Sequence, residues 1–171
     1  YDAPTLFSDD MHVLDPKKNA AFEFCEAELY LAYKEGKLVG RVAAIINHKA
    51  NKQWDTKAVR FGWIDFIDDI EVSRALLDAV GNYGKAHGMD NIIGPLGFTD
   101  MDPEGMLTDG FDQLGTMATL YNYPYYPRHM QELGGWEKDN DYVEYKLIVP
   151  KEMPEKYMKV AQMIEKCYDL H

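Results

Sequence analysis

Asp65 is the residue whose type and position most clearly allow chemistry, because it is a carboxylate inside the apolar segment 59–67 (VRFGWIDFI). In a strand it shares a face with Phe61 and Trp63, since side chains on one face recur every second residue. Loss of surrounding water raises the pKa of a carboxyl group, which suits a general base that accepts a proton from an amine. The alternative is an ion pair with Arg41 or Arg60 inside the sheet, and the sequence leaves both open.

A proton donor could come from the segment 121–129 (YNYPYYPRH), which is rich in tyrosine. Tyr125, Tyr126 and His129 each carry a phenol or an imidazole that can donate a proton, and Tyr126 is our first choice as general acid. The alternative interpretation is an aromatic and proline-containing loop that packs against a sheet.

Other reactive arrangements are not recognisable in the sequence. Residues 100–107 (DMDPEGML) match part of a calcium loop, but Phe111 stands where a bidentate Glu is needed, so a turn held by Asp side chains is the preferred interpretation. No two histidines have ligand spacing, and we predict no metal site. Cys25 is predicted to be a small core residue, and Cys167 lies far from it along the sequence. No Ser-His-Asp arrangement is visible in the sequence.

The charge balance limits the classes of partner. The 171 residues include 18 Lys and Arg against 29 Asp and Glu, a net charge of -11. Nucleic acid and anionic membranes would be repelled, so we expect neither as a partner, whereas a cationic partner is mildly favoured. The chain has no 18-residue apolar run, no apolar leader and only two cysteines, which predicts a cytoplasmic protein. It starts without Met and ends inside a helical pattern, so we expect a piece of a longer protein.

Hydrophobic periodicity and turn residues predict the elements that position these side chains. The order begins with an irregular arm (1–21) that has room for one helical turn, a hairpin (22–47) that turns at 35–37 and a central strand (59–67). An amphipathic helix (71–88) with a capping box from Asp68 to Glu71 and a strand (91–98) follow. A long connection (97–124), in which the short piece 116–120 could be a strand, leads to a short helix ended by Gly134-Gly135, a last strand (142–147) and a helix (154–170).

This element order resembles that of the GNAT N-acetyltransferase superfamily. The segments GKLVGRVAAI, GPLGFTDMDPEGMLTDGFD and YNYPYYPRHMQELGGWEK are similar to a bacterial branch of it, and the likeness covers residues 14–150. The resemblance implies a mixed α/β (α+β) fold with a mostly antiparallel central sheet flanked by helices. It divides the chain into an arm (1–21), the GNAT-like acyltransferase domain (22–150) and a C-terminal helix (151–171) that leads into a further region.

The resemblance also implies a function. It implies transfer of an acyl group from acetyl-CoA or another acyl-CoA to the amine of a small molecule or peptide, with Asp65 as base and Tyr126 as acid. The cofactor diphosphate would meet the start of the predicted helix at four residues: Ile70, Glu71, Val72 and Ser73.

Two positions depart from the superfamily pattern. The turn that is basic and Gly-rich in the superfamily reads Asp68-Asp69-Ile70-Glu71-Val72 here, and the position of the usual catalytic tyrosine holds Gln131. Carboxylates at a helix start oppose a diphosphate, because the helix dipole already has negative partners there. The alternative function is therefore a catalytically inactive GNAT-like module for binding or dimerisation, and a homodimer is compatible with either interpretation.

Overall fold

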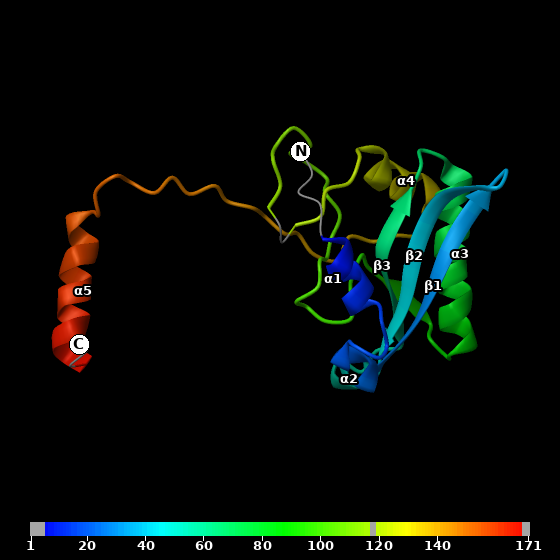
Figure 1. Ribbon diagram of the computed structural model, residues 1–171, viewed down its shortest axis with the longest axis horizontal. Coiled ribbons are helices and arrows are strands. Elements are labelled where there is room, and N and C mark those ends of the chain that lie inside the picture. The colour runs from blue at the N-terminus through cyan, green and yellow to red at the C-terminus, as the bar shows by residue number, and fades with distance from the viewer. Residues whose placement is uncertain (1–5, 117–118, 169–171) are drawn as a thin grey trace. The chain divides into compact units, whose positions relative to one another are not determined.

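A mixed α+β fold with a four-stranded, mostly antiparallel sheet flanked by helices is seen in the computed structural model, as expected from the sequence. The structure describes residues 6–116 and 119–168. The chain divides into two compact units, residues 1–138 and 139–171, and each is considered by itself. The first unit contains the sheet (Figure 1). Every predicted site residue also falls within it.

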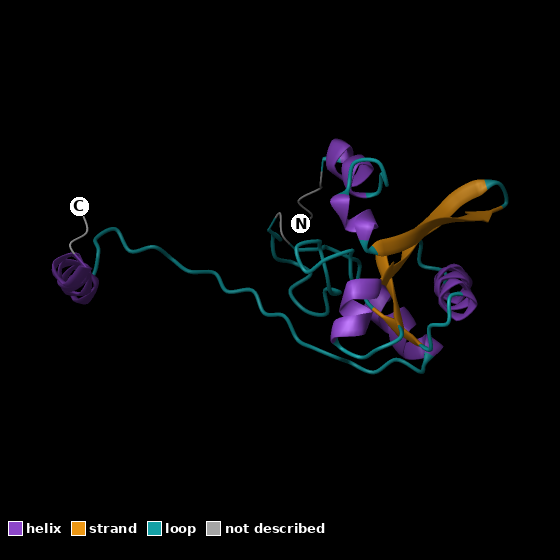
Figure 2. Cartoon of the chain, turned by 90° about the horizontal axis from the view of Figure 1, so that it is seen from below, coloured by secondary structure: helices purple, strands orange, loops and turns teal. Residues whose placement is uncertain are grey.

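The sheet has the strand order β1-β2-β3-β4. Its strands are β1 (Cys25–Lys34), β2 (Lys37–Asn47), β3 (Ala58–Phe66) and β4 (Asn91–Ile93), of which β3 and β4 are parallel and the other pairs antiparallel. The predicted hairpin is confirmed: Glu35 and Gly36 have φ of 51° and 75°, and positive φ at both central residues is typical of a two-residue turn that matches strand twist. The tip of this hairpin projects from the sheet in Figure 2.

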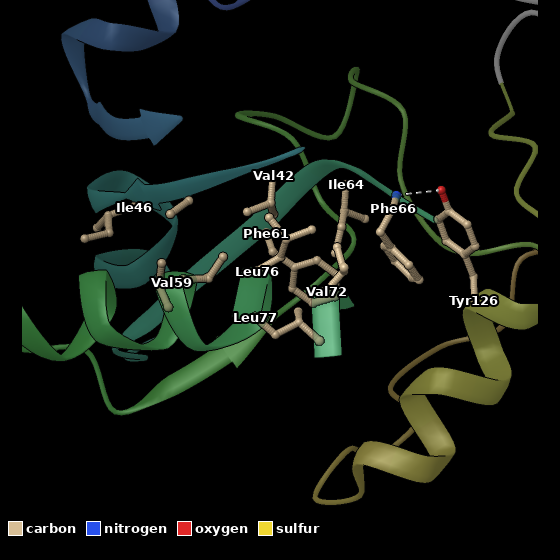
Figure 3. Packing of buried hydrophobic residues seen from close by; sticks show 12 residues of the cluster. Val42, Ile46, Val59, Phe61, Ile64, Phe66, Val72, Leu76, Leu77 and Tyr126 are labelled. Carbon is tan, nitrogen blue, oxygen red and sulfur yellow. Dashed lines mark hydrogen bonds between the residues drawn. The ribbon is translucent and has the colours of Figure 1, made fainter. Parts of the chain in front are cut away.

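The main core lies between one face of the sheet and the helix α3 (Ile70–Ala86). Apolar residues of α3 recur at helical spacing and bury Val72, Leu76 and Val80 against β2 and β3 (Figure 3). The predicted helix is thus confirmed, but its N-cap is Asp69 and not Asp68, because the Asp69 carboxylate accepts the Glu71 backbone N–H at 3.0 Å.

The opposite face of the sheet carries a second, smaller core. It is formed by Cys25, Ala43, Ile45 and Phe98 together with the 3-10 helix η1 (Ala20–Glu23), and Val13 of the helix α1 (Phe7–Val13) packs against it. The predicted arm therefore contains a two-turn helix, and the predicted loop after β2 contains the helix α2 (His48–Gln53). Figure 2 shows helices on both sides of the strands.

Three predicted strands differ from the structure. The strand predicted at 91–98 ends at Ile93. The next residue, Gly94, has a φ of 157° and lies so close to Phe61 that a side chain would not fit. In the segment 116–120 the described residues form no strand, and 117–118 lie outside the described residues.

The last predicted strand, 142–147, is also wrong. Residues 137–150 form no strand or helix, and the side chains of the segment 142–149 are exposed. An alternating pattern becomes a strand only where another strand receives its backbone N–H and C=O groups, and no described strand pairs with this one. The second unit also contains the amphipathic helix α5 (Glu155–Tyr168), as predicted, with no buried residue.

Candidate functional site

A bulge in β3 decides where Asp65 lies. Arg41 pairs with Asp65 but Ala43 pairs with Gly62, so β3 has one more residue than β2 in this stretch, and Trp63 takes a φ of 46°. The extra residue puts Phe61 in the main core and Trp63 against the smaller one. Asp65 comes two residues after Trp63 and therefore lies on the same face of the strand as Trp63. It does not share a face with Phe61, although the unbroken strand pattern predicted that it would.

Asp65 is not desolvated in the way that the sequence pattern implied. Its side chain is 57% exposed, and its Oδ2 accepts a hydrogen bond from Arg41 Nε at 2.7 Å. The ion pair with Arg41, one of the two alternatives for Asp65, is therefore observed, whereas Arg60 donates to the carbonyls of Gly97 and Phe98. The burial that supported Asp65 as a base is absent, and its catalytic role stays a prediction.

Tyr126, the predicted acid, lies beside Asp65. It belongs to the helix α4 (Tyr125–Leu133), is 6% exposed and stacks on Phe66 with ring centroids 4.1 Å apart. Its hydroxyl accepts the Phe66 backbone N–H at 3.2 Å (Figure 3). The same hydroxyl donates to Asp65 Oδ1 at 3.3 Å. Burial raises the pKa of the Tyr126 phenol well above its usual range, because the phenolate is disfavoured away from water. The structure therefore brings the two predicted catalytic residues into contact.

On the edge away from β2, the end of β3 is covered by α4, while β2 pairs with Asp65 and Phe66 on the other edge. β4 pairs with β3 only at residues 58–60 and then turns away. Beyond that point Tyr126 binds the N–H of Phe66, and the Tyr125 hydroxyl donates to the Phe66 carbonyl at 2.7 Å. The alternative in which this aromatic segment packs against the sheet is observed, whereas the role of Tyr126 as general acid stays a prediction.

A pocket of about 310 Å³ opens beside these residues. Its lining comes from the start of β2, the end of β3 and the segment that enters α4: Leu38, Val39, Gly40, Arg41, Asp65, Phe66, Ile67, Tyr123, Tyr125 and Tyr126. The lining combines one ion pair, three tyrosines and several aliphatic groups. Such a site can hold a ligand that has one charged group and an apolar part.

A buried histidine ties α4 to the start of α3, and the sequence analysis did not anticipate it. His129 is 2% exposed, and its Nδ1 and Nε2 lie 3.0 Å from Ser73 Oγ and 3.0 Å from Asp68 Oδ1. Ser73 is fully buried, so this Ser-His-Asp chain presents no nucleophile to a substrate. Arg128 also donates to Asp68, and this bond holds the pKa of the Asp68 carboxyl below its usual range. Sequence could not reveal the chain of contacts, because docking of α4 brings the three residues together.

The turn 68–73 does not fit the diphosphate of a CoA thioester in the way that the resemblance implies. The Glu71 amide is taken by the Asp69 side chain, and the amides of Val72 and Ser73 bond to the Asp69 carbonyl. The cations at this turn are already paired: Arg128 donates to Asp68, and Lys34 Nζ is 2.6 Å from Asp69 Oδ2, a bond that lowers the pKa of Asp69. A diphosphate would have to displace these contacts and face three carboxylates. The predicted cofactor residues lie together but have no open cradle.

The described residues, 6–116 and 119–168, hold no group of three His, Cys, Asp or Glu side chains placed for a metal ion. In the segment that partly matches a calcium loop, Asp102 Oδ2 accepts the Thr99 backbone N–H at 2.9 Å. Within the described part of the chain, no helix has the length and apolar character needed to cross a bilayer.

The chain is similar in sequence to two curated bacterial proteins. No family model matches the chain, and no solved structure matches it. It is 29% identical over 140 residues to Protein YghO of Escherichia coli K12, which covers 76% of this chain and 36% of that protein. It is 30% identical over 151 residues to a bacterial ceramide synthase of Caulobacter vibrioides, which covers 88% of this chain and 39% of that protein.

The chain spans less than two fifths of the length of each of these two curated relatives. Of these two relatives, the one from Caulobacter vibrioides carries a name that states an activity, ceramide synthase. Membership of the GNAT superfamily in particular stays a prediction.

Proposed function

We propose that this chain forms part of an acyltransferase-type protein that joins an acyl group to the amine of a small molecule or peptide. The observation that carries the proposal is the 30% identity over 151 residues to a protein named bacterial ceramide synthase. A ceramide is an N-acylated amino alcohol, so a protein with this name makes an amide bond. Because the chain covers 39% of that relative, the proposal concerns the whole protein to which the chain contributes.

The pocket beside Asp65 supports the amine half of this proposal. Two of the roughly four lone-pair sites of the Asp65 carboxylate are taken, by Arg41 and Tyr126, which leaves sites for an ammonium group. In the proposed reaction Asp65 holds the ammonium and accepts its proton. Tyr126 keeps its proton over the neutral pH range, because burial raises the pKa of its phenol. Its hydroxyl donates a hydrogen bond to Asp65, and it remains the general acid that we propose.

Acetyl-CoA or another acyl-CoA is the acyl donor that we propose, on the basis of the sequence resemblance. A CoA thioester would supply an activated acyl group. The residues at the start of α3 have their amides engaged by Asp69, so we assign no step to Ile70, Glu71, Val72 or Ser73.

The test is a direct assay for amide formation. The full-length protein is incubated with acyl-CoAs of several chain lengths and a panel of amines, and products are identified by mass spectrometry. Loss of a general base lowers turnover by about 10²- to 10⁴-fold, so Asp65→Asn should lower the rate of amide formation by that factor. Asp78→Asn, which changes an exposed carboxylate on α3, is the matched control. Absence of amide with every donor and amine would refute the proposal.

A second candidate function is a binding or dimerisation module without catalysis. The observation that favours it is the capped, acidic turn at the start of α3, where the resemblance expects a diphosphate. Thermal unfolding with acyl-CoA separates the two candidates, since a ligand at 100 times its dissociation constant stabilises a protein by about 2.7 kcal/mol. No shift at millimolar acyl-CoA and low salt, together with no amide product, would favour the module.

A further inference from the structure

Tyr123 is an exposed aromatic side chain that the structure holds in place at the mouth of the pocket. Tyr123 is 58% exposed, and its backbone is held by hydrogen bonds of the residue before it. The neighbouring Asn122 is buried and uses its side-chain amide to bind both backbone groups of Leu107, at 2.6 Å to the N–H and 3.1 Å to the carbonyl. Asn122 also donates to the Tyr123 carbonyl at 3.2 Å, so the segment before α4 is clamped.

The ring of Tyr123 is oriented as well as anchored. It stacks nearly parallel on Tyr125, with an angle of 12° and ring centroids 5.6 Å apart. The ring of Tyr121 stands nearly perpendicular to it, with an interplanar angle of 78° and ring centroids 6.1 Å apart. The Tyr121 hydroxyl donates to the Phe111 carbonyl. Burial does not hold the Tyr123 ring in this position, because most of it is exposed. The pocket therefore has a fixed aromatic wall that costs little conformational entropy to keep for a ligand.

The charges at the same pocket favour a cation. Arg41 is the positive group in the lining, and it is matched by two carboxylates, Asp65 at 2.7 Å and Asp10 at 3.6 Å. Of the two carboxylates, Asp65 lines the pocket and Asp10 does not, so the positive charge of Arg41 is shared and none of it is left unmatched in the lining. A cation near an aromatic face gains from the negative face of the ring, and a carboxylate close by adds a direct ion pair.

We infer that this pocket binds an organic ammonium ion that carries an alkyl group, and that Tyr123 selects the charged ligand through its ring face. The ammonium lies between the Tyr123 ring and the free lone pairs of Asp65, and the alkyl group contacts Leu38 and Ile67. This inference rests on the proposed function for its choice of pocket, and it names the class of amine: a protonated alkylamine and not a neutral alcohol or an anionic amino acid.

The experiment measures binding without an acyl donor, so that it does not depend on turnover. Hexylammonium chloride at pH 7 is titrated into the full-length protein and followed by isothermal titration calorimetry, with hexanol as the neutral probe of similar shape. Hexylammonium should bind saturably and more tightly than hexanol. Tyr123→Ala should weaken the binding of hexylammonium about 2- to 5-fold, the range expected for a cation over an exposed ring, while Tyr123→Phe retains it.

Asp65→Asn should weaken hexylammonium binding by about tenfold, because the ion pair and its charge-assisted hydrogen bond are lost. Trp54→Ala is the matched control, since Trp54 is an exposed aromatic residue that follows α2 and does not line the pocket. The inference is overturned if wild type does not bind hexylammonium, if hexanol binds equally well, or if Tyr123→Ala binds like Trp54→Ala. Hexylammonium binding without any amide product would refute the proposed function alone.

Discussion

Removal of one oxygen atom, in Tyr126→Phe, tests whether α4 is held to the end of β3 as the structure shows. The substitution keeps the ring that stacks on Phe66 but removes the hydroxyl that accepts the Phe66 backbone N–H at 3.2 Å. That hydrogen bond is buried, and among the described residues no strand receives the N–H on this edge of β3, because β2 pairs on the other edge and β4 pairs only at residues 58–60. A buried donor left without a partner costs about 1–3 kcal/mol, so the free energy of unfolding should fall by that amount.

The lost bond to Asp65 adds little to this cost, because Asp65 is more than half exposed and water replaces the hydroxyl. For a chain of this size, about 1 kcal/mol corresponds to a shift of about 2–4 °C in Tm. Urea unfolding followed by circular dichroism gives the free energy directly, and exchange of the Phe66 amide hydrogen reports the local effect. Tyr33→Phe is the matched control, since Tyr33 is 63% exposed and its loss of a hydroxyl should change stability by less than about 0.5 kcal/mol. Equal stability of the two variants, with unchanged exchange at Phe66, would refute the assigned contact.

Two further predictions concern the start of α3 and the smaller core. Asp69→Ala should lower the free energy of unfolding in urea by about 0.5–2 kcal/mol. Asp69→Asn should keep most of the stability, because an amide oxygen also caps the Glu71 N–H. Equal losses in both variants would point to the Lys34 ion pair instead. Burial raises the pKa of Cys25 from 9.0 to about 11, so the stability that the protonated thiol contributes is present below pH 9 and is lost as the pH rises toward 11. Urea unfolding from pH 8 to 10.5 should show Cys25→Ala losing less stability than wild type over this range, and parallel curves would contradict the assignment.

The sequence predicts those parts of the fold in which a local pattern and a tertiary contact agree. The β1–β2 hairpin follows from two apolar runs around Glu35-Gly36, and its turn needs only a residue pair that tolerates positive φ. The helix α3 follows from apolar residues at helical spacing that face a single sheet. In α3 the residues that set the periodicity are also those that are buried, whereas the turn residues Glu35 and Gly36 are exposed and act through their backbone conformation alone.

The candidate site lies where local pattern and tertiary structure disagree. The period of two in β3 predicted that Asp65 and Phe61 share a face, but the bulge at Trp63 shifts the second half of the strand by one residue. Within the letters GWID, Gly62 is compatible with a bulge, but Trp63, which takes the positive φ, is an uncommon residue in that conformation. The last predicted strand failed for the complementary reason, since its alternation is clear and no described strand receives it.

The arrangement of α4 links the acidic turn and the pocket into one physical argument. Three side chains on one face of α4 bind the segment 65–73: Tyr125 and Tyr126 at Phe66, and His129 at Asp68 and Ser73. Asp68 and Asp69 are thereby committed to α4, to Lys34 and to capping α3. Asp65 is the carboxylate of this segment that faces the pocket, and its partner Arg41 is shared with Asp10. The negative charge that opposes a diphosphate at the turn is thus structural, while the charge at the pocket is open to an ammonium ligand, which is why an amine site is the better-supported half of the proposed function.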